Sequence, residues 1–288
     1  MKSQFSLGFG PFRRDSGQYS QSFYQEIRSL LKRSSLFLAL WVLISAGEID
    51  SKEITLFSHF TDSSPRIAGE GNLLKQKFTP ASTFKYWITL FLLERNLIGP
   101  AFKRTSDEAH IPNVPRDLTL REAMYYSSNS FFLAFFEENP QLYEELEDFL
   151  LRIGYVPETF KKHYLDKKNI YFSDAIQKSP EEQHEFLLEF LKDEGRSKGV
   201  SPETFRRWKE AAFWSECDFQ NSIVYGKTGS LRGSFWFLGF LEKKQNLWRR
   251  WIANAPKEYS VITVLQTGEG VSRGTAIDSF YRTAGCKR

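Results

Sequence analysis

The chain of 288 residues is 41% hydrophobic and 26% charged, which is the composition of an ordinary globular protein with a sizeable core. These proportions exclude a disordered chain, collagen and a coiled coil, and the absence of repeated blocks excludes a solenoid or a propeller. Aromatic residues make up 16% of the positions, so we expect an interior rich in aromatic contacts.

The formal net charge of +4 comes entirely from residues 1–47, which carry six basic and two acidic side chains. The rest of the chain holds 33 residues of each sign and gives no argument for a nucleic-acid partner. The basic stretch precedes the apolar segment 36–46, LFLALWVLISA, a pattern typical of an export signal. The uncharged run 34–47 has 14 residues, whereas a membrane span needs roughly 18.

We therefore expect a signal-type leader over 1–47 and one folded domain over 48–288, exported to the periplasm or the medium, without a stable membrane span. A buried N-terminal helix is the alternative for the apolar segment. The sequence does not indicate an oligomeric state.

Cysteine and histidine form no pattern of a metal or redox site. Cys217 and Cys286 lack CxxC spacing, and the four histidines are scattered without an HExxH motif, so we expect no metal. The two cysteines of an exported protein can pair, but the sequence alone does not decide this. No GxSxG motif marks a serine hydrolase that uses histidine.

The predicted elements run from strand to helices and back to strands. Residues 53–60 are typical of a strand, and 66–68 begin its hairpin partner. The stretch 82–97, between Pro80 and Gly99, predicts a helix with almost no polar face, which places it in the core. Further helices are expected at 118–137, 141–153 and 180–192, strands at 223–228, 235–241 and 259–266, and a closing helix at 276–282. This order predicts an α+β fold, with an antiparallel sheet built from both chain ends and an all-helical insertion.

Three short motifs carry chemistry, and the first is the SxxK pattern Ser82-Thr83-Phe84-Lys85 at the start of the buried helix. Residues i and i+3 share a helix face, so Lys85 can reach the Ser82 hydroxyl. A serine nucleophile needs an adjacent base, and burial favours the uncharged amine of lysine because it disfavours the ammonium. Alone, the pattern equally fits a capping serine beside a surface lysine, and it occurs again at 29–32.

The second motif is Ser127-Ser128-Asn129, where a hydroxyl and an amide two residues apart can point into one cleft. The hydroxyl could relay a proton and the amide could hold a substrate carbonyl. The third is Lys227-Thr228-Gly229 at a strand end, where glycine allows a close approach and the other two side chains offer a cation and a hydroxyl to an anion. Alone, these motifs fit a polar loop and a strand that ends in a turn.

In this order, SxxK, SxN and KTG are the signature of the penicillin-recognising serine acyl transferases, which include β-lactamases and cell-wall transpeptidases. From about Glu53 to Ala284 the chain resembles the class D β-lactamases. The similar segments are FTPASTFK at 78–85, LTLREAMYYS at 118–127, SPEEQHEFLLEFL at 179–191, YGKTG at 225–229 and WFLGF at 236–240.

The resemblance implies a resistance enzyme that opens the ring of a small-molecule β-lactam through an acyl-enzyme. It implies that Ser82 is the nucleophile, Lys85 the general base, and Ser127 the group that passes a proton to the leaving nitrogen. It places the oxyanion hole at the backbone amides of Ser82 and Ser230. The residues expected to bind substrate are Asn129, Lys227, Thr228, Gly229, Ser230 and Arg273, and the last would pair with the substrate carboxylate.

The resemblance implies no cofactor other than carbon dioxide, which would carboxylate Lys85 to make the base for deacylation. Three positions depart from the family pattern. Asn129 stands where the class usually has an apolar residue, Tyr155-Val156-Pro157 replaces Tyr-Gly-Asn, and Tyr171 replaces a tryptophan that holds the carboxylate. These departures predict incomplete carboxylation and slow deacylation.

Two other functions stay open. A transpeptidase or carboxypeptidase acting on peptidoglycan is favoured by Asn129 but disfavoured by the short length. A β-lactam sensor domain would acylate without turnover, but it would need a membrane-spanning segment beyond the short leader.

The charge split and the Ile-Ser-Ala boundary predict that the mature protein begins near Gly47 and lies outside the cytoplasm. Amino-terminal sequencing of the protein recovered from the periplasm or the medium checks this. Recovery of Met1 at the start of an exported, active form would contradict it.

Overall fold

A computed structural model describes residues 51–160, 175–244 and 257–287. The predicted leader, the second SxxK pattern at 29–32, and Tyr171 lie outside these residues. No helix in the described ranges is long and apolar enough to cross a membrane.

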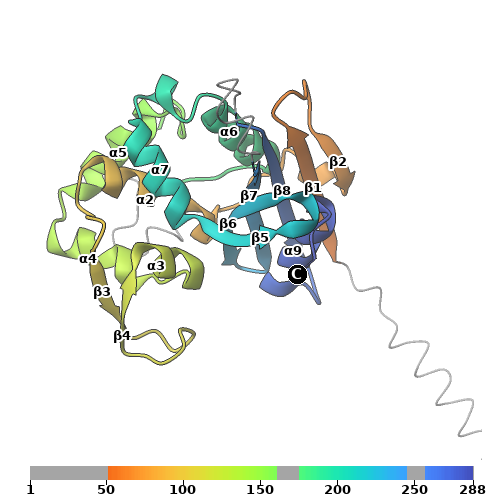
Figure 1. The fold of residues 1–288 in the computed structure, drawn as a ribbon. Coiled ribbons are helices and arrows are strands. Elements are labelled where there is room, and N and C mark those ends of the chain that lie inside the picture. Colours follow the sequence, from red (N-terminus) through yellow and green to blue (C-terminus); the bar gives the residue numbers. More distant parts are fainter. Residues whose placement is uncertain (1–50, 161–174, 245–256, 288) are drawn as a thin grey trace, which may run out of the picture. The chain divides into compact units, whose positions relative to one another are not determined.

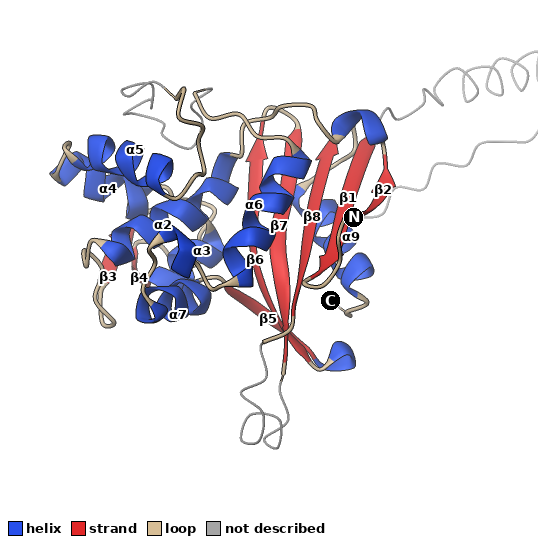
Figure 2. Ribbon diagram, turned by 90° about the horizontal axis from the view of Figure 1, so that it is seen from above, coloured by secondary structure: helices blue, strands red, loops and turns tan. Residues whose placement is uncertain are grey.

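The centre of the described chain is a six-stranded antiparallel sheet in the order β2-β1-β8-β7-β6-β5 (Figures 1 and 2). The strands are β1 (Lys52–His59), β2 (Arg66–Gly69), β5 (Phe213–Cys217), β6 (Ser222–Leu231), β7 (Ser234–Lys243) and β8 (Tyr259–Thr267). Strand β1, the first in the chain, pairs along its full length with β8, the last in the chain, from Lys52 opposite Thr267 to His59 opposite Ser260. The prediction of one sheet built from both chain ends is confirmed.

Helices cover both faces of this sheet (Figure 2). The α-helices are α2 (Lys85–Glu94), α3 (Leu120–Tyr126), α4 (Ser130–Glu138), α5 (Leu142–Arg152), α6 (Pro180–Lys192), α7 (Pro202–Ala211) and α9 (Arg273–Ala284). Short 3-10 turns lie at η1 (Gly71–Leu73), η2 (Ala81–Phe84), η3 (Arg196–Lys198) and η4 (Asp218–Gln220), and a separate hairpin joins β3 (Lys103–Ser106) to β4 (Arg116–Thr119).

Side chains alternate along the central strands and so build a core on each face of the sheet. On β7, Phe237 faces α9 and its ring lies 4.2 Å from that of Phe280. Leu238 and Phe240 face the other way and join the larger helical core, where Phe240 stacks on Trp208 of α7. The continuous apolar run of β7 therefore reflects a strand that is buried on both faces.

Helix α2 runs through the larger core, and all its residues from Lys85 to Leu93 are buried. Trp87 is surrounded by rings, at 4.7 Å from Phe186, 5.4 Å from Phe190 and 5.3 Å from Tyr155. Burying a large apolar side chain stabilises the fold by about 1.5–3 kcal/mol. The same packing keeps water from the first turn of the helix, where Lys85 lies.

A buried histidine ties α6 to the sheet. His184 Nε2 lies 2.8 Å from Ser58 Oγ of β1, and its Nδ1 lies 3.1 Å from Thr263 Oγ1 of β8. Burial lowers the pKa of His184 to about 4, so the ring is neutral at neutral pH. The helix itself begins as predicted, because Ser179 and Glu182 form a capping box just before and after Pro180.

The helical prediction for 118–137 is wrong in detail. The segment begins inside strand β4, forms the two short helices α3 and α4, and breaks between them at 127–129. Ser127 ends α3 with a left-handed backbone (φ 61°), which turns the chain before α4 starts. The polar run 127–130 coincides with this break, but apolar residues on both sides of it, which face the same core, led to the prediction of one helix.

The sequence patterns did not indicate β5, α7 or the β3–β4 hairpin, and because of this hairpin the insertion is not all-helical as predicted. Helix α7 had a usable signal, because Ser201 caps it and Pro202 opens it, the same arrangement as at α6. The hairpin strands have only four residues each, too few to show a period.

The two cysteines form a disulfide bond that joins the end of β5 to the residues after α9. Their separation in sequence is 69 residues, so the link closes a long loop of the unfolded chain.

Replacing both cysteines (Cys217→Ala with Cys286→Ala) should lower the free energy of unfolding by about 2–4 kcal/mol, because the unfolded chain regains the entropy of that loop. Urea denaturation followed by circular dichroism measures the change. A reducing agent should lower the midpoint of the wild type and leave the double variant unchanged. Equal midpoints for oxidised and reduced wild type would contradict a stabilising bond.

Candidate active site

Ser82 lies in turn η2, directly before helix α2, and a chain of hydrogen bonds fixes this turn. Thr83 Oγ1 donates to the Pro80 carbonyl at 2.6 Å and accepts from Gln183 Nε2 at 3.0 Å. The Tyr155 hydroxyl donates to Gln183 Oε1 at 3.2 Å. Tyr155 and Gln183 belong to segments already compared with the class D pattern, and their role here is to hold the serine turn against α6.

Lys85 brings the first two motifs together. Its Nζ lies 3.2 Å from Ser82 Oγ and 3.3 Å from Ser127 Oγ. The same nitrogen donates to the Ser127 carbonyl at 2.8 Å and to Asn129 Oδ1 at 2.6 Å. The amine of the predicted base, Lys85, therefore contacts both the predicted nucleophile, Ser82, and the predicted proton-relay residue, Ser127.

Lys227 joins the third motif to this cluster. Its buried Nζ donates to Ser127 Oγ at 2.9 Å and to the Thr228 carbonyl at 2.9 Å. Ser127 Oγ thus lies within hydrogen-bond distance of two lysine amines, so its position is suited to the exchange of a proton.

Gly229 allows strand β6 to lie against the serine turn. A Cβ atom at this position would be 2.8 Å from the Pro80 carbonyl oxygen and 3.1 Å from Thr83 Cγ2. The glycine of the KTG motif is thus required by packing on the protein's own turn. Ser230, the next residue, is exposed near the end of β6.

Two non-glycine residues in the site have left-handed backbones, Ala81 with φ 49° and Ser127 with φ 61°. Such conformations cost of order 1–3 kcal/mol and persist only where surrounding contacts hold them. Ser127 is held by its contacts with both lysines, and its neighbour Ser128 donates its backbone N–H to the Ala123 carbonyl at 2.9 Å.

Burial is the main cause that shifts both lysines toward the uncharged form. The pKa of Lys85 is lowered to about 7, mainly by burial, while Glu108 raises it and Arg273 lowers it. Burial, followed by the charges of Lys85 and Arg273, holds the pKa of Lys227 well below its ordinary value. At neutral pH a substantial share of Lys85 is therefore an uncharged amine able to accept a proton.

Arg273 is the first residue of α9, and it lies near the cluster without bonding to it. Its Nη2 donates to the Tyr125 carbonyl at 3.1 Å. Within the described part of the chain, its Nε is buried without a hydrogen-bond partner. A buried N–H of a guanidinium group in this position is suited to an incoming carboxylate.

Glu108 was missed by sequence analysis. Its carboxylate accepts hydrogen bonds from the backbone N–H of Asn129, at 2.7 and 3.1 Å, and of Ser130, at 3.0 Å. The residue follows β3 in a connection without a recognisable motif, so no sequence signal indicated it.

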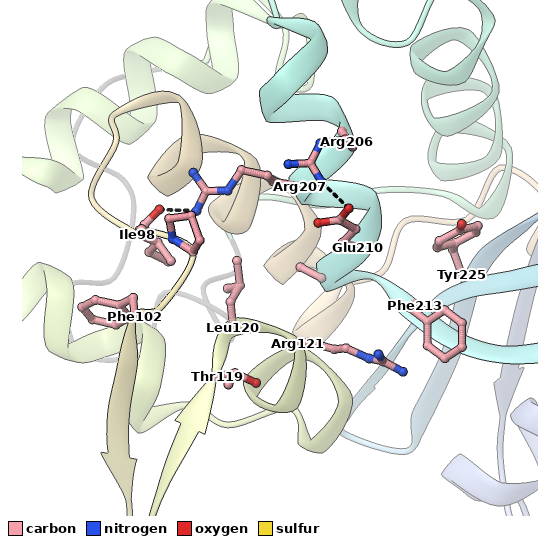
Figure 3. Close-up of a pocket in the computed structure, with 13 residues that line it drawn as sticks. Ile98, Phe102, Thr119, Leu120, Arg121, Arg206, Arg207, Glu210, Phe213 and Tyr225 are labelled. Carbon is pink, nitrogen blue, oxygen red and sulfur yellow. Dashed lines mark hydrogen bonds and ion pairs between the residues drawn. The ribbon is translucent and has the colours of Figure 1, made fainter.

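A separate pocket of about 430 Å³ lies between α7, the start of α3 and the loop after α2 (Figure 3). Its polar side chains are engaged with the protein itself. Arg207 Nη2 donates to the Ile98 carbonyl at 2.5 Å, and Arg206 pairs with Glu210. None of the predicted site residues lines it, so it is distinct from the motif cluster.

Comparisons with known proteins agree with the motifs and the fold. Residues 57–184 match the family of the penicillin binding protein transpeptidase domain. No match was found among curated protein sequences.

Solved structures with a similar fold include the BPu1 β-lactamase (20% identity, TM-score 0.65), which covers 82% of this chain and 93% of its own. A class D β-lactamase from Bacillus subtilis has 19% identity and a TM-score of 0.62, and covers 83% of this chain and 94% of its own. One from Sebaldella termitidis has 22% identity and a TM-score of 0.61, and covers 84% and 94%. The predicted α+β fold and the resemblance to penicillin-recognising proteins, most like class D, are confirmed.

Proposed function

We propose that this protein is a serine β-lactamase of the class D type that acylates readily through Ser82 and deacylates slowly. The observation that carries the proposal is the position of Lys85 Nζ, 3.2 Å from Ser82 Oγ and 3.3 Å from Ser127 Oγ, in a buried site where its pKa is about 7. This geometry supplies a base for the nucleophile and a route for the proton.

Acylation requires one proton to move from the serine to the leaving nitrogen. An uncharged amine has two N–H groups and one lone pair. When the carbonyl oxygens of Ser127 and Asn129 accept the two hydrogens of Lys85, its lone pair can take the proton of Ser82 Oγ. That oxygen then bonds to the lactam carbonyl carbon, the C–N bond breaks, and Ser127 Oγ protonates the nitrogen and regains its proton from the ammonium formed on Lys85.

The substrate carboxylate would be held by Arg273, with its buried Nε–H, and by the side chains of Lys227 and Thr228. The backbone amides of Ser82 and Ser230 would form the oxyanion hole. We propose that the protein works outside the cytoplasm, where β-lactams and a disulfide-bonded domain are both found.

The contacts of Lys85 fit an unmodified amine better than an N-carboxylated one. Its nitrogen donates to the Ser127 carbonyl, an oxygen that can only accept, and to Asn129 Oδ1. A carboxylate on Lys85 would bring negative oxygens next to these acceptors. We therefore route no step through a carboxylated lysine and expect the water that attacks the acyl-enzyme to lack a strong base.

One contact favours a second candidate. The bond between Asn129 and Lys85, at 2.6 Å, is the SxN arrangement that sequence analysis associated with transpeptidases. A transpeptidase, carboxypeptidase or sensor would use the same acylation, and it would differ in the lifetime of the penicillin adduct.

Ser82→Ala should abolish covalent labelling by a fluorescent penicillin, because no other hydroxyl lies between Lys85 and the serine turn among the contacts described. Gel fluorescence and intact-protein mass spectrometry measure the adduct. Ser63→Ala, at an exposed bend, is the matched control and should label like the wild type. Labelling of Ser82→Ala at the wild-type rate would overturn the assignment.

If Lys85 acts unmodified, bicarbonate should leave the deacylation rate of the wild type unchanged. Asn129→Val removes one carbonyl acceptor from the amine and should make deacylation faster with bicarbonate than without it. Carbon-13 NMR in labelled bicarbonate should show a carbamate signal only in the variant.

A carbamate signal and bicarbonate stimulation in the wild type would contradict the unmodified amine. An adduct that lasts for hours in the wild type, with or without bicarbonate, would favour the sensor or the transpeptidase as the function of this protein.

A further inference from the structure

Glu108 binds the backbone at the end of the motif loop 127–129. Its carboxylate accepts from the backbone N–H of Asn129 and from that of Ser130, the residue with which α4 begins. These charge-assisted bonds also place a negative charge at the amino end of the helix, which is favourable. The carboxylate therefore anchors the end of the loop at which Asn129 lies.

Other contacts hold the start of the loop, where Ser127 contacts both lysines and the Ser128 backbone N–H donates to the Ala123 carbonyl. Ser127 has a left-handed backbone, which a serine adopts only under constraint. From it the chain must present Ser127 Oγ to both lysines and Asn129 Oδ1 to Lys85. Movement of the Asn129 backbone by even an ångström would break the 2.6 Å contact with Lys85, because hydrogen bonds weaken steeply with distance.

Glu108 also places a negative charge near the basic side chains of the site. The charged groups that face Lys85 from the described elements are Lys227 on β6, Arg273 on α9, and Glu108 after β3. Burial and Arg273 favour the uncharged amine of Lys85, whereas Glu108 favours the ammonium. Glu108 therefore opposes the two other influences on this amine.

We propose that Glu108 is a positioning residue for acylation, which holds the 127–129 loop on Lys85 and, by its charge, sets the pH range in which Lys85 accepts the Ser82 proton. The proposal rests on the proposed function, because it requires that Ser82 be acylated. It assigns Glu108 no contact with substrate.

Two variants separate the effect of the Glu108 charge from its effect as a hydrogen-bond acceptor for the loop. Glu108→Gln keeps an oxygen that can accept from Asn129 and Ser130, but it removes the charge. Glu108→Ala removes both. Asp107→Asn, at the exposed neighbouring position, removes a charge of the same sign and is the matched control.

The acylation rate is measured by stopped flow with a fluorescent penicillin from about pH 5 to about pH 9. In the wild type it should rise through about pH 7, as the ammonium of Lys85 loses its proton. In Glu108→Gln this rise should move to lower pH, by on the order of one unit, since loss of a nearby negative charge disfavours the ammonium. The variant should thus react faster than the wild type in acid, a gain that damage to the fold cannot produce.

Glu108→Ala should acylate at least about tenfold more slowly than Glu108→Gln above pH 8, where Lys85 is uncharged in both, because only the glutamine anchors the loop. Asp107→Asn should keep the wild-type profile. A wild-type profile for Glu108→Gln, or the same displacement in Asp107→Asn, would overturn the proposal. If Glu108→Ala does not fold, the profile of Glu108→Gln still decides.

Failure of the proposed function is distinguishable from failure of this inference. If the wild type forms no penicillin adduct, the proposed function falls. If the wild type is labelled and Glu108→Gln follows the wild-type pH dependence, only the proposed role of Glu108 is contradicted.

Discussion

The Lys85 amine is held in a water-excluded position at the start of a helix that is buried all along its length. An ammonium group placed there loses its hydration, and Arg273 adds a charge of the same sign nearby, against which Glu108 acts. The ordinary preference of lysine for the charged state is therefore nearly cancelled. Because the helix is rigidly packed among aromatic rings, the amine cannot move out to water to recover its charge.

Other parts of the site serve to place partners around that amine. The hydrogen bonds from Tyr155 through Gln183 to Thr83 fix the serine turn, and Gly229 lets β6 approach it closely. The strained backbone of Ser127 turns a hydroxyl toward two lysines at once. Strain of this kind is kept at a site because the surrounding packing over-determines it.

An asparagine in the SxN motif changes what the lysine can do. An apolar residue would leave the amine head without a partner on that side, whereas Asn129 Oδ1 gives it a close acceptor. This contact orients an unmodified amine toward Ser82 and competes with a carboxylate on the same nitrogen. The proposed combination of fast acylation and slow deacylation rests on this one side chain, whose backbone N–H donates to Glu108.

The sequence by itself determined the elements whose signals are local: the strands of the sheet other than β5, the start of α6, the buried helix after Pro80, and the order of the three motifs. Tertiary structure alone decided which strands of the two chain ends pair, the bond between the two cysteines, and the approach of Glu108 to Asn129. The physical reason is the distance along the chain over which each kind of interaction acts. Periodicity and capping act over a few residues, whereas a buried amine acquires its pKa and its partners from segments that meet only when the core closes.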